Sequence, residues 1–301
     1  MNNVLAALWP LFALIVAGFY AHKLGFLGDG FWPGAEKLNY FVLFPALLLN
    51  SLATAPLHNP ALPRLLGAVS LMLGLIWVGL LVMRRVRRWP ASRFGVLLQG
   101  TVRFNTYLGL AIVSSLYGKD SLLLAAVMLA LLVPAVNVMS VLALTSDRHP
   151  SAKTIVMPLI KNPLILACLI GIVLNLAGIE LRGGTDRLVA LLAATSLPLG
   201  LLCVGAALKL GELHGELPAL LSNSLIRLFA MPALAWTCGH LLKLPAIESA
   251  LLVLFFALPT APTAYVLTRQ LGGDSHLMAG IITLQTLLCA LSLMVVLTVA
   301  T

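Results

Sequence analysis

Residues 257–263 read Ala-Leu-Pro-Thr-Ala-Pro-Thr and fall in the middle of a long apolar segment. A proline has no backbone N–H, and its ring clashes with the carbonyl group four residues earlier in a helix. Pro259 and Pro262 therefore free the carbonyls of Phe255 and Leu258 from helical hydrogen bonds. The segment predicts an apolar helix that is interrupted near its middle.

The composition of the chain indicates that its solvent is lipid. Of 301 residues, 60% are hydrophobic and 10% are charged, and the mean hydropathy is +1.04. A soluble domain carries about 25% charged residues because its surface faces water. The composition excludes a soluble enzyme, a disordered protein and, despite a net charge of +9, a nucleic-acid-binding protein.

Ten apolar segments have the length of membrane-spanning helices. They are 4–21, 38–55, 61–83, 95–117, 121–145, 155–179, 187–208, 217–242, 249–268 and 277–300. We expect the first to be a retained span and not a secretory signal, because its positive charges follow the apolar core instead of preceding it. An even number of spans places both termini on one side of the membrane.

The distribution of positive charge sets the orientation. Most of the loop lysines and arginines, including those of 84–88, fall on the side opposite the termini. Because cytoplasmic loops are enriched in Lys and Arg, we expect both termini to be extracytoplasmic. The sequence thus predicts a multi-pass protein of the cell inner membrane.

Prolines and glycines of the first half recur in the second half at a constant spacing. A displacement of 153 residues superimposes Pro and Gly positions, namely Pro10 on Pro163, Gly18 on Gly171, Gly25 on Gly178 and Pro45 on Pro198. We expect two repeats, 1–150 and 154–301, with five spans each. An odd number of spans inverts the second repeat, and inverted repeats are typical of secondary transporters.

In the repeat, a second polar segment of the first half corresponds to the double proline of the second half. Residues 101–107 contain Arg103, Asn105 and Thr106 at mid-membrane depth but no proline. A charge at that depth costs about 2.5–3.5 kcal/mol, so Arg103 should face a cavity, pair with freed carbonyls or extend towards the interface. Half-helix N-termini at the two breaks would favour an anion. We expect Asn105, Arg103 and Thr106, with Thr260 and Ala261, to contact the substrate.

Other polar residues inside the spans are weaker candidates. Asn137 and Ser51 could line the substrate path, although Asn137 could instead bond a neighbouring helix. Arg227 and Gln285 are expected to have structural roles, Gln285 through a bond between helices. The pattern predicts no metal site and no cofactor, and it leaves coupling to a proton or sodium gradient open.

Three stretches resemble one known family. KLNYFVLFPALLLNSLA (37–53), RFNTYLGLA (103–111) and ALPTAPTAYVLTRQLGGD (257–274) are similar to the auxin efflux carriers, whose fold is related to that of the bile acid sodium symporters. The resemblance implies ten helices as two inverted five-helix repeats, with broken helices 4 and 9 that cross. Helices 1, 2, 6 and 7 would form a scaffold, and helices 3–5 and 8–10 a moving transport domain. It also implies substrate contacts at Asn105 and Asn137.

Compact bacterial members of this family resemble malonate and malate permeases. We therefore expect a secondary transporter of a small organic-acid anion that works by alternating access, and not an enzyme. A channel, a transport-like sensor and a carrier of an auxin-like monocarboxylate remain alternatives. The architecture also permits a homodimer.

Overall fold

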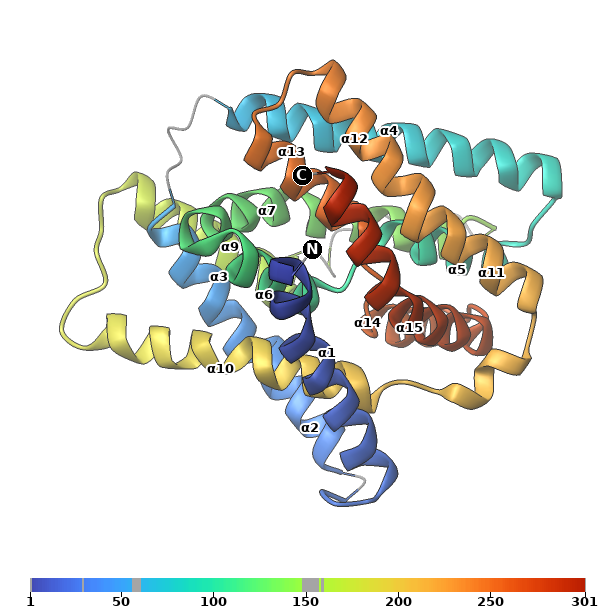
Figure 1. The fold of residues 1–301 in the computed structure, drawn as a ribbon, viewed down its shortest axis with the longest axis horizontal. Coiled ribbons are helices and arrows are strands. Elements are labelled where there is room, and N and C mark those ends of the chain that lie inside the picture. Colours follow the sequence, from blue (N-terminus) through green and yellow to red (C-terminus); the bar gives the residue numbers. More distant parts are fainter. Residues whose placement is uncertain (1, 29, 56–60, 148–156, 158–159, 301) are drawn as a thin grey trace. The chain divides into compact units, whose positions relative to one another are not determined.

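The computed structural model describes residues 2–28, 30–55, 61–147, 157 and 160–300. Within these ranges every regular element is a helix, and no strand occurs (Figure 1). Backbone groups inside a bilayer must find their partners within the protein, which favours helices. The predicted all-helical class is confirmed for this part of the chain.

The described part of the first half contains three long uninterrupted helices, α1, α4 and α7, and several shorter ones. Its elements are α1 (Asn2–Lys23), α2 (Phe31–Leu38), the π-helix η1 (Asn39–Leu43), α3 (Phe44–Ala53), α4 (Leu62–Arg87), α5 (Ala91–Val102), α6 (Thr106–Leu116) and α7 (Gly118–Leu144).

The second half is more finely divided. Its elements are α9 (Pro163–Leu176), α10 (Thr185–Ala206), the 3₁₀-helix η2 (Leu210–His214), α11 (Leu217–Leu225), the π-helix η3 (Ile226–Ala230), α12 (Met231–Leu241), α13 (Ala246–Ala257), α14 (Thr263–Gln270) and α15 (Ser275–Ala300).

Seven helical stretches of the described chain are long and apolar enough to cross a membrane. The other three predicted segments consist of shorter pieces. Residues 38–55 form η1 and α3, the described part of 155–179 contains α9, and 249–268 is divided between α13 and α14. The chain is therefore a multi-pass membrane protein, while the number of ten spans stays a prediction.

The chain forms two compact units that each combine segments from both halves. Unit 1 comprises Met1–Leu62, Thr106–Val133 and Ile160–Ala207. Unit 2 comprises Pro63–Asn105, Pro134–Leu159 and Leu208–Thr301. The units do not coincide with the two predicted repeats, whose boundaries stay a prediction.

Glycines bring helices of unit 1 into close contact. A Cβ on Gly18 of α1 would lie 2.0 Å from Leu202 O of α10, and one on Gly205 of α10 would lie 1.8 Å from Ile15 O of α1. Gly171 of α9 faces α3 in a similar way, with its Cβ position 2.8 Å from a side chain of that helix. Because lipid offers little hydrophobic drive for association, small residues at such interfaces allow tight packing.

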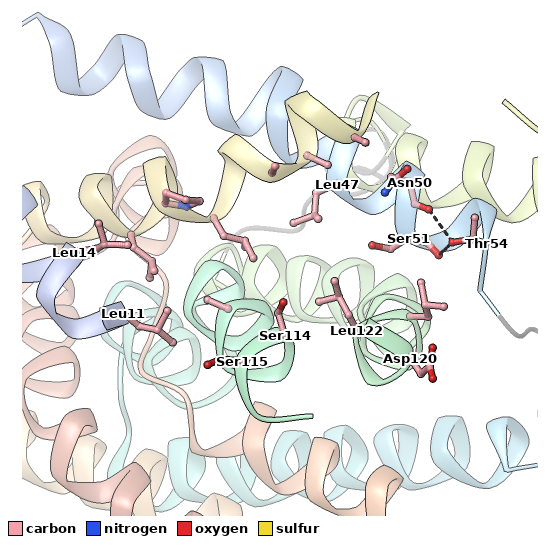
Figure 2. Close-up of a pocket in the computed structure, with 18 residues that line it drawn as sticks. Leu11, Leu14, Leu47, Asn50, Ser51, Thr54, Ser114, Ser115, Asp120 and Leu122 are labelled. Carbon is pink, nitrogen blue, oxygen red and sulfur yellow. Dashed lines mark hydrogen bonds between the residues drawn. The ribbon is translucent and has the colours of Figure 1, made fainter. Parts of the chain in front are cut away.

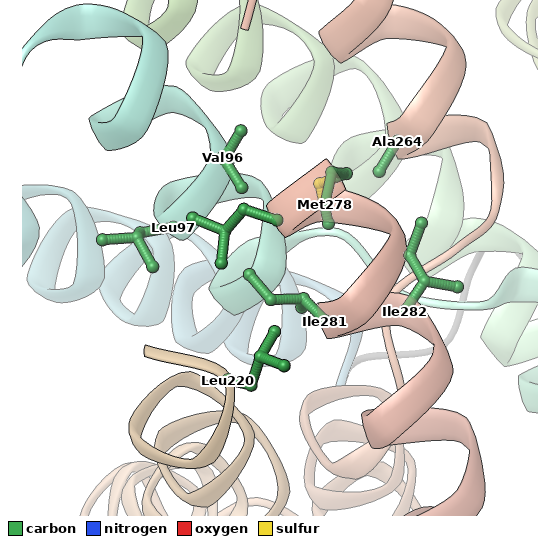
Figure 3. Packing of buried hydrophobic residues seen from close by; sticks show 8 residues of the cluster. Val96, Leu97, Leu220, Ala264, Met278, Ile281 and Ile282 are labelled. Atoms are coloured by element: carbon green, nitrogen blue, oxygen red, sulfur yellow. The ribbon is translucent and has the colours of Figure 1, made fainter. Parts of the chain in front are cut away.

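One apolar cluster organises unit 2 (Figure 3). It joins α5, α11, α14 and α15 through Val96, Leu97, Leu220, Ala264, Leu277, Met278, Ile281 and Ile282. α15 therefore packs against α5, which precedes one helix break, and α14, which follows the other. One helix next to each break thus contributes to the same apolar cluster.

Candidate functional site: a crossing of two helix breaks

The break in the second half lies between Ala257, where α13 ends, and Thr263, where α14 begins. Leu258 leaves the helix with φ −69° and ψ 149°. A residue that precedes proline is pushed out of the helical region by the proline ring, and Pro259 follows Leu258. Pro262 precedes α14 with φ −56°, a value that suits the start of a helix. The two prolines therefore account for both ends of this break.

The break in the first half has nearly the same backbone geometry without a proline. α5 ends at Val102, and Arg103 adopts φ −74° and ψ 140° before α6 begins at Thr106. The last turn of α5 is complete, since Arg103 N–H donates to Gln99 O at 2.9 Å. No residue type in 103–105 forces this extended conformation. Its cause lies in contacts with other helices.

The two breaks are joined through the main chain of unit 2. Asn105 N–H donates to Pro259 O at 2.8 Å. The rings of Phe104 and Phe255 meet edge to face, with centroids 5.6 Å apart. Asn105 is 1% exposed and Pro259 is buried, so this bond is shielded from solvent. The chain therefore crosses itself where both helices are interrupted.

Arg103 connects the first break to the start of α14. Its side chain is half-buried, and Nη2 donates to Thr263 Oγ1 at 3.3 Å. The N-terminus of a helix carries a partial positive charge, although the N–H groups of Ala264 and Tyr265 at the start of α14 already bond Ala261 O and Pro262 O. The guanidinium and the helix end thus place positive potential at one point of the crossing.

Arg227 bonds main-chain carbonyls of both segments at the crossing. It lies in η3, is 0% exposed, and uses three nitrogens on three carbonyls. Nε donates to Leu258 O at 2.6 Å, Nη1 to Thr101 O at 2.7 Å, and Nη2 to Phe255 O at 2.9 Å. The last four carbonyls of a helix have no partner within it. One guanidinium therefore satisfies carbonyls at the ends of both α5 and α13.

The charge of Arg227 faces the negative ends of two helix dipoles. α5 and α13 both end at the crossing, and a helix C-terminus is equivalent to about half a negative charge. These two ends stabilise the buried guanidinium through neutral carbonyl groups. Two of its acceptors, Phe255 O and Leu258 O, are the carbonyls that the proline positions free.

Gln285 of α15 bonds to both breaks. Its Oε1 accepts the N–H of Thr260 at 2.9 Å, and its Nε2 donates to Gly100 O at 3.0 Å. The same amide nitrogen donates to Asn223 Oδ1 of α11 at 3.0 Å, and Asn223 Nδ2 donates to Leu97 O at 2.9 Å. All of these groups are buried. A satisfied buried network of this kind fixes one arrangement of its helices.

Gly100 leaves the space that this network needs. A Cβ at this position would lie 2.2 Å from Asn223 Oδ1 and 3.0 Å from Ile281 Cγ2. The amide of Asn223 could not then approach α5. The glycine is required here because it has no side chain. Its backbone conformation is helical and would suit residues that have a Cβ.

Several residues predicted to contact the substrate lie at this crossing. Arg103 and Asn105 belong to the first break, and Thr260 and Ala261 to the second. Thr260 is 0% exposed and its hydroxyl donates to Gln285 Oε1 at 2.7 Å. Its side chain is therefore engaged in holding the break. Ala261 is half-buried.

The other predicted residues lie on different elements. Asn137 is half-buried on α7, in the part of that helix that belongs to unit 2. Thr106 is the half-buried first residue of α6 and belongs to unit 1. Ser51 is 5% exposed on α3, also in unit 1.

Ser51 lines a cavity of about 770 Å³ in unit 1 (Figure 2). α1 and α10 supply apolar walls, and α3, α6 and α7 supply the polar groups Asn50, Ser51, Thr54, Ser114, Ser115 and Asp120. This volume is in the range of small-molecule sites. The hydroxyl and amide groups could bind a polar solute, whereas the exposed carboxylate of Asp120 would repel an anion at that end.

The sequence indicated some of the supporting residues and missed one. The structural roles expected for Arg227 and Gln285 agree with their hydrogen bonds. Asn223 was missed, although it lies one helical turn before Arg227 in the same apolar segment and could have been found from that spacing. Within the described residues, no three His, Cys, Asp or Glu side chains gather where they could hold a metal ion.

Seven helical stretches in the described ranges have the length and apolar character to cross a membrane, which makes this a multi-pass membrane protein. A family model described as "Membrane transport protein" matches residues 3–297, and the chain belongs to this family. The resemblance to the auxin efflux carriers is thereby confirmed. The chain is also 22% identical over 293 residues to an "Uncharacterized transporter" of Methanothermobacter thermautotrophicus, covering 93% of each protein. This family is not a class of enzymes.

Proposed function

We propose that this protein is a secondary transporter of a small organic-acid anion, a dicarboxylate such as malonate or malate, in the cell inner membrane. The family supports a transporter with a small-molecule substrate. The anionic substrate and the mechanism are inferred from the chemistry of the crossing.

The observation that carries the proposal is the guanidinium of Arg103 at the N-terminus of α14. Its Nη2 lies 3.3 Å from Thr263 Oγ1, the first residue of that helix. Helix N-termini and guanidinium groups are both preferred partners of carboxylates. The amide of Asn105, next to this point in the chain, could donate to a second oxygen. We propose Arg103, Asn105 and Ala261 as substrate contacts, with Thr106, Asn137, Ser51 and Thr260 as further candidates.

The packing within unit 1 supports the proposed inverted repeat of ten helices. α1 packs against α10 and α9 packs against α3, the pairs that an exchange of the two repeats would interconvert. The matched glycines Gly18 and Gly171 both lie at these close contacts. We number the ten predicted spans in chain order. We propose that spans 1, 2, 6 and 7 (4–21, 38–55, 155–179 and 187–208) form the scaffold, and that spans 3–5 and 8–10 move to alternate access. The charge distribution favours extracytoplasmic termini, and a homodimer fits this architecture.

The proposal is tested by counterflow of labelled malonate in proteoliposomes. We expect uptake into vesicles loaded with unlabelled malonate, with stronger inhibition by dicarboxylates than by monocarboxylates or an indole acid. Current that is proportional to voltage would instead show a channel, and tight binding without flux a sensor. Either result would overturn the proposed carrier.

The residue assignment needs variants in the same vesicles. Asn105→Ala and Arg103→Gln should each abolish counterflow, while Arg269→Gln, which changes an exposed arginine at the other end of α14, should not. Size-exclusion profiles would verify that each variant is folded. Normal flux in Asn105→Ala would refute this site. In wild-type vesicles that show counterflow, imposed pH and sodium gradients would identify the coupling ion.

A further inference from the structure

Unit 2 contains a cavity of about 430 Å³ between α4, α5 and α11. One face of α5 forms a wall over three successive turns, with Arg93, Leu97 and Thr101. Residues four apart in a helix lie on the same face. The cavity therefore changes from charged to apolar to polar as it follows α5 inward.

The outer end of the cavity is basic. Arg87, the exposed last residue of α4, lines it together with the half-buried Trp89 and Arg93. Arg93 Nη1 donates to Glu216 Oε1 at 2.9 Å, so one carboxylate offsets one of the two arginines. Among the described residues, no acidic side chain forms an ion pair with Arg87. The outer end keeps a net positive charge.

The middle of the cavity is apolar and has a firm wall. Leu80 and Met83 of α4 face it from the helix that ends in Arg87, and Ile226 closes it from η3. Leu97 also belongs to the apolar core of unit 2. These side chains offer nothing to a hydrated ion but would pack against a hydrocarbon chain.

The turn between α4 and α5, which carries the basic end of the cavity, contains a residue with a strained backbone conformation. Arg88 adopts a left-handed conformation with φ 52°, in which glycine is favoured over any residue with a Cβ. Trp89 N–H closes the turn by donating to Arg84 O at 3.2 Å. Arg84 itself is bound to Asp147 and stacks on the ring of Phe94, with 5.0 Å to its centroid. Trp89 is thus held at the cavity, and tryptophan is enriched at membrane interfaces.

We propose that this cavity binds one anionic phospholipid, with its phosphate at Arg87 and Arg93 and an acyl chain along Leu80, Met83 and Ile226. Basic pockets between membrane helices bind anionic headgroups. A free anion would make no contact with the apolar wall, and a lipid without net charge would leave the charge of Arg87 uncompensated. The inner end, at Thr101 and Asn223, is formed by residues of the network at the first break. The proposal does not depend on the identity of the substrate.

Native mass spectrometry of the full-length protein, released from mixed vesicles of phosphatidylglycerol and phosphatidylcholine in equal amounts, tests the proposal. The wild type should retain phosphatidylglycerol preferentially. Arg87→Gln should lower that preference about five-fold, which corresponds to about 1 kcal/mol per basic residue. Arg85→Gln is the matched control, because Arg85 is exposed on the same turn but does not line the cavity. An equal effect of both variants would indicate general surface attraction and overturn the site.

A second pair of variants tests the acyl chain without changing charge. Ser222→Phe would fill the apolar part of the cavity and should reduce retention of phosphatidylglycerol at least five-fold, whereas Leu225→Phe, on the same helix but outside the lining, should not. Retention that survives Ser222→Phe and is displaced by millimolar inorganic phosphate would show an ion site without a lipid, and would contradict the proposal. Equal retention of both lipids by the wild type would contradict it as well.

Discussion

The two helix breaks of unit 2 have similar backbone geometry and different origins. Leu258 has ψ 149° because a proline follows it, whereas Arg103 has ψ 140° with no proline nearby. The second break is encoded by its own prolines and is also held by Arg227, which bonds Phe255 O and Leu258 O. The first is imposed by side chains that lie far away in the sequence.

Those distant side chains are Arg227, Asn223 and Gln285. They bond the carbonyls of Thr101, Leu97 and Gly100 in the last turns of α5. The carbonyls of Gly100 and Thr101 would need the N–H groups of residues 104 and 105 to continue the helix. External donors take that place, so α5 can stop without a residue that breaks helices. Loss of these donors should therefore disturb the first break more than the second.

The largest effect is expected for Arg227→Leu. It leaves three buried carbonyls without their donor, and each unsatisfied acceptor costs about 1–3 kcal/mol. We expect a destabilisation of about 3 kcal/mol or more, seen as a large fall of the apparent Tm in detergent. Hydrogen exchange measured by mass spectrometry should rise more in residues 100–107 than in residues 257–264.

Two further variants calibrate this result. Arg227→Lys keeps the charge but lacks the planar fork that reaches three acceptors, so its loss should be smaller but clear. Arg182→Leu, which changes an arginine that is exposed and paired with Glu180, should leave the apparent Tm nearly unchanged. Equal exchange at both breaks in Arg227→Leu would show that they do not differ in origin.

A smaller effect is expected for Gln285→Met. The variant keeps the side-chain length but loses the bonds to Gly100 O and Thr260 N–H, at a cost of about 1–3 kcal/mol. Gln99→Met is the matched comparison, because the Gln99 amide bonds a side chain, from Nε2 to Thr268 Oγ1 at 2.8 Å, whereas Gln285 bonds two main-chain groups. Thermal unfolding in detergent should rank Gln285→Met as clearly less stable. The reverse order would contradict the role given to Gln285.

Pro259→Ala should have a weaker effect on stability. Arg227 still bonds Phe255 O and Leu258 O, so the break persists, and the loss of about 0.4–1 kcal/mol reflects the more flexible unfolded chain. Exchange in residues 100–107 should stay at the wild-type level. A rise there as large as in Arg227→Leu would mean that the proline also creates the first break.

The smallest effect concerns the ion pair of Glu216 with Arg93, outside the crossing. The guanidinium donates to the carboxylate and lowers the pKa of Glu216 below its usual value. A lowered folded-state pKa contributes stability above the unfolded pKa, and this contribution is lost as the pH falls through the folded pKa. Because the carboxylate is 51% exposed, the contribution should be below about 1 kcal/mol.

Apparent Tm values of the wild type and Glu216→Gln check this expectation. The difference between the two proteins should be present at neutral pH and vanish in acid, where the wild-type carboxylate is protonated. It should also shrink in high salt. A difference that does not change with pH would assign the effect to packing.

The sequence predicts the second break from two prolines three residues apart. It locates the first break only through the repeat, since residues 101–107 contain no helix breaker. The position of Arg227 inside an apolar segment is visible in the sequence, but its partners are not. They depend on η3, a π-helix that shifts which side chains of the segment face α5 and α13.

The candidate site is predicted to a similar extent. Arg103 and Asn105 lie at the crossing, as expected from the repeat. The engagement of the Thr260 hydroxyl with Gln285 could not be foreseen, because the two residues are brought together by the packing of α15. Ser51 lines a cavity whose polar groups come from three helices, and no single segment of the sequence reveals such a cavity.

The central claim, that an organic anion binds at the crossing, is tested most directly by protection of an introduced thiol. Ala261→Cys places a cysteine at the half-buried second break, while the four native cysteines are buried and give the background. Malonate should slow alkylation at this position and leave alkylation of Thr185→Cys, in an exposed position at the start of α10, unchanged. Equal alkylation rates at position 261 with and without malonate, in protein that shows malonate counterflow, would place the substrate elsewhere and contradict the account.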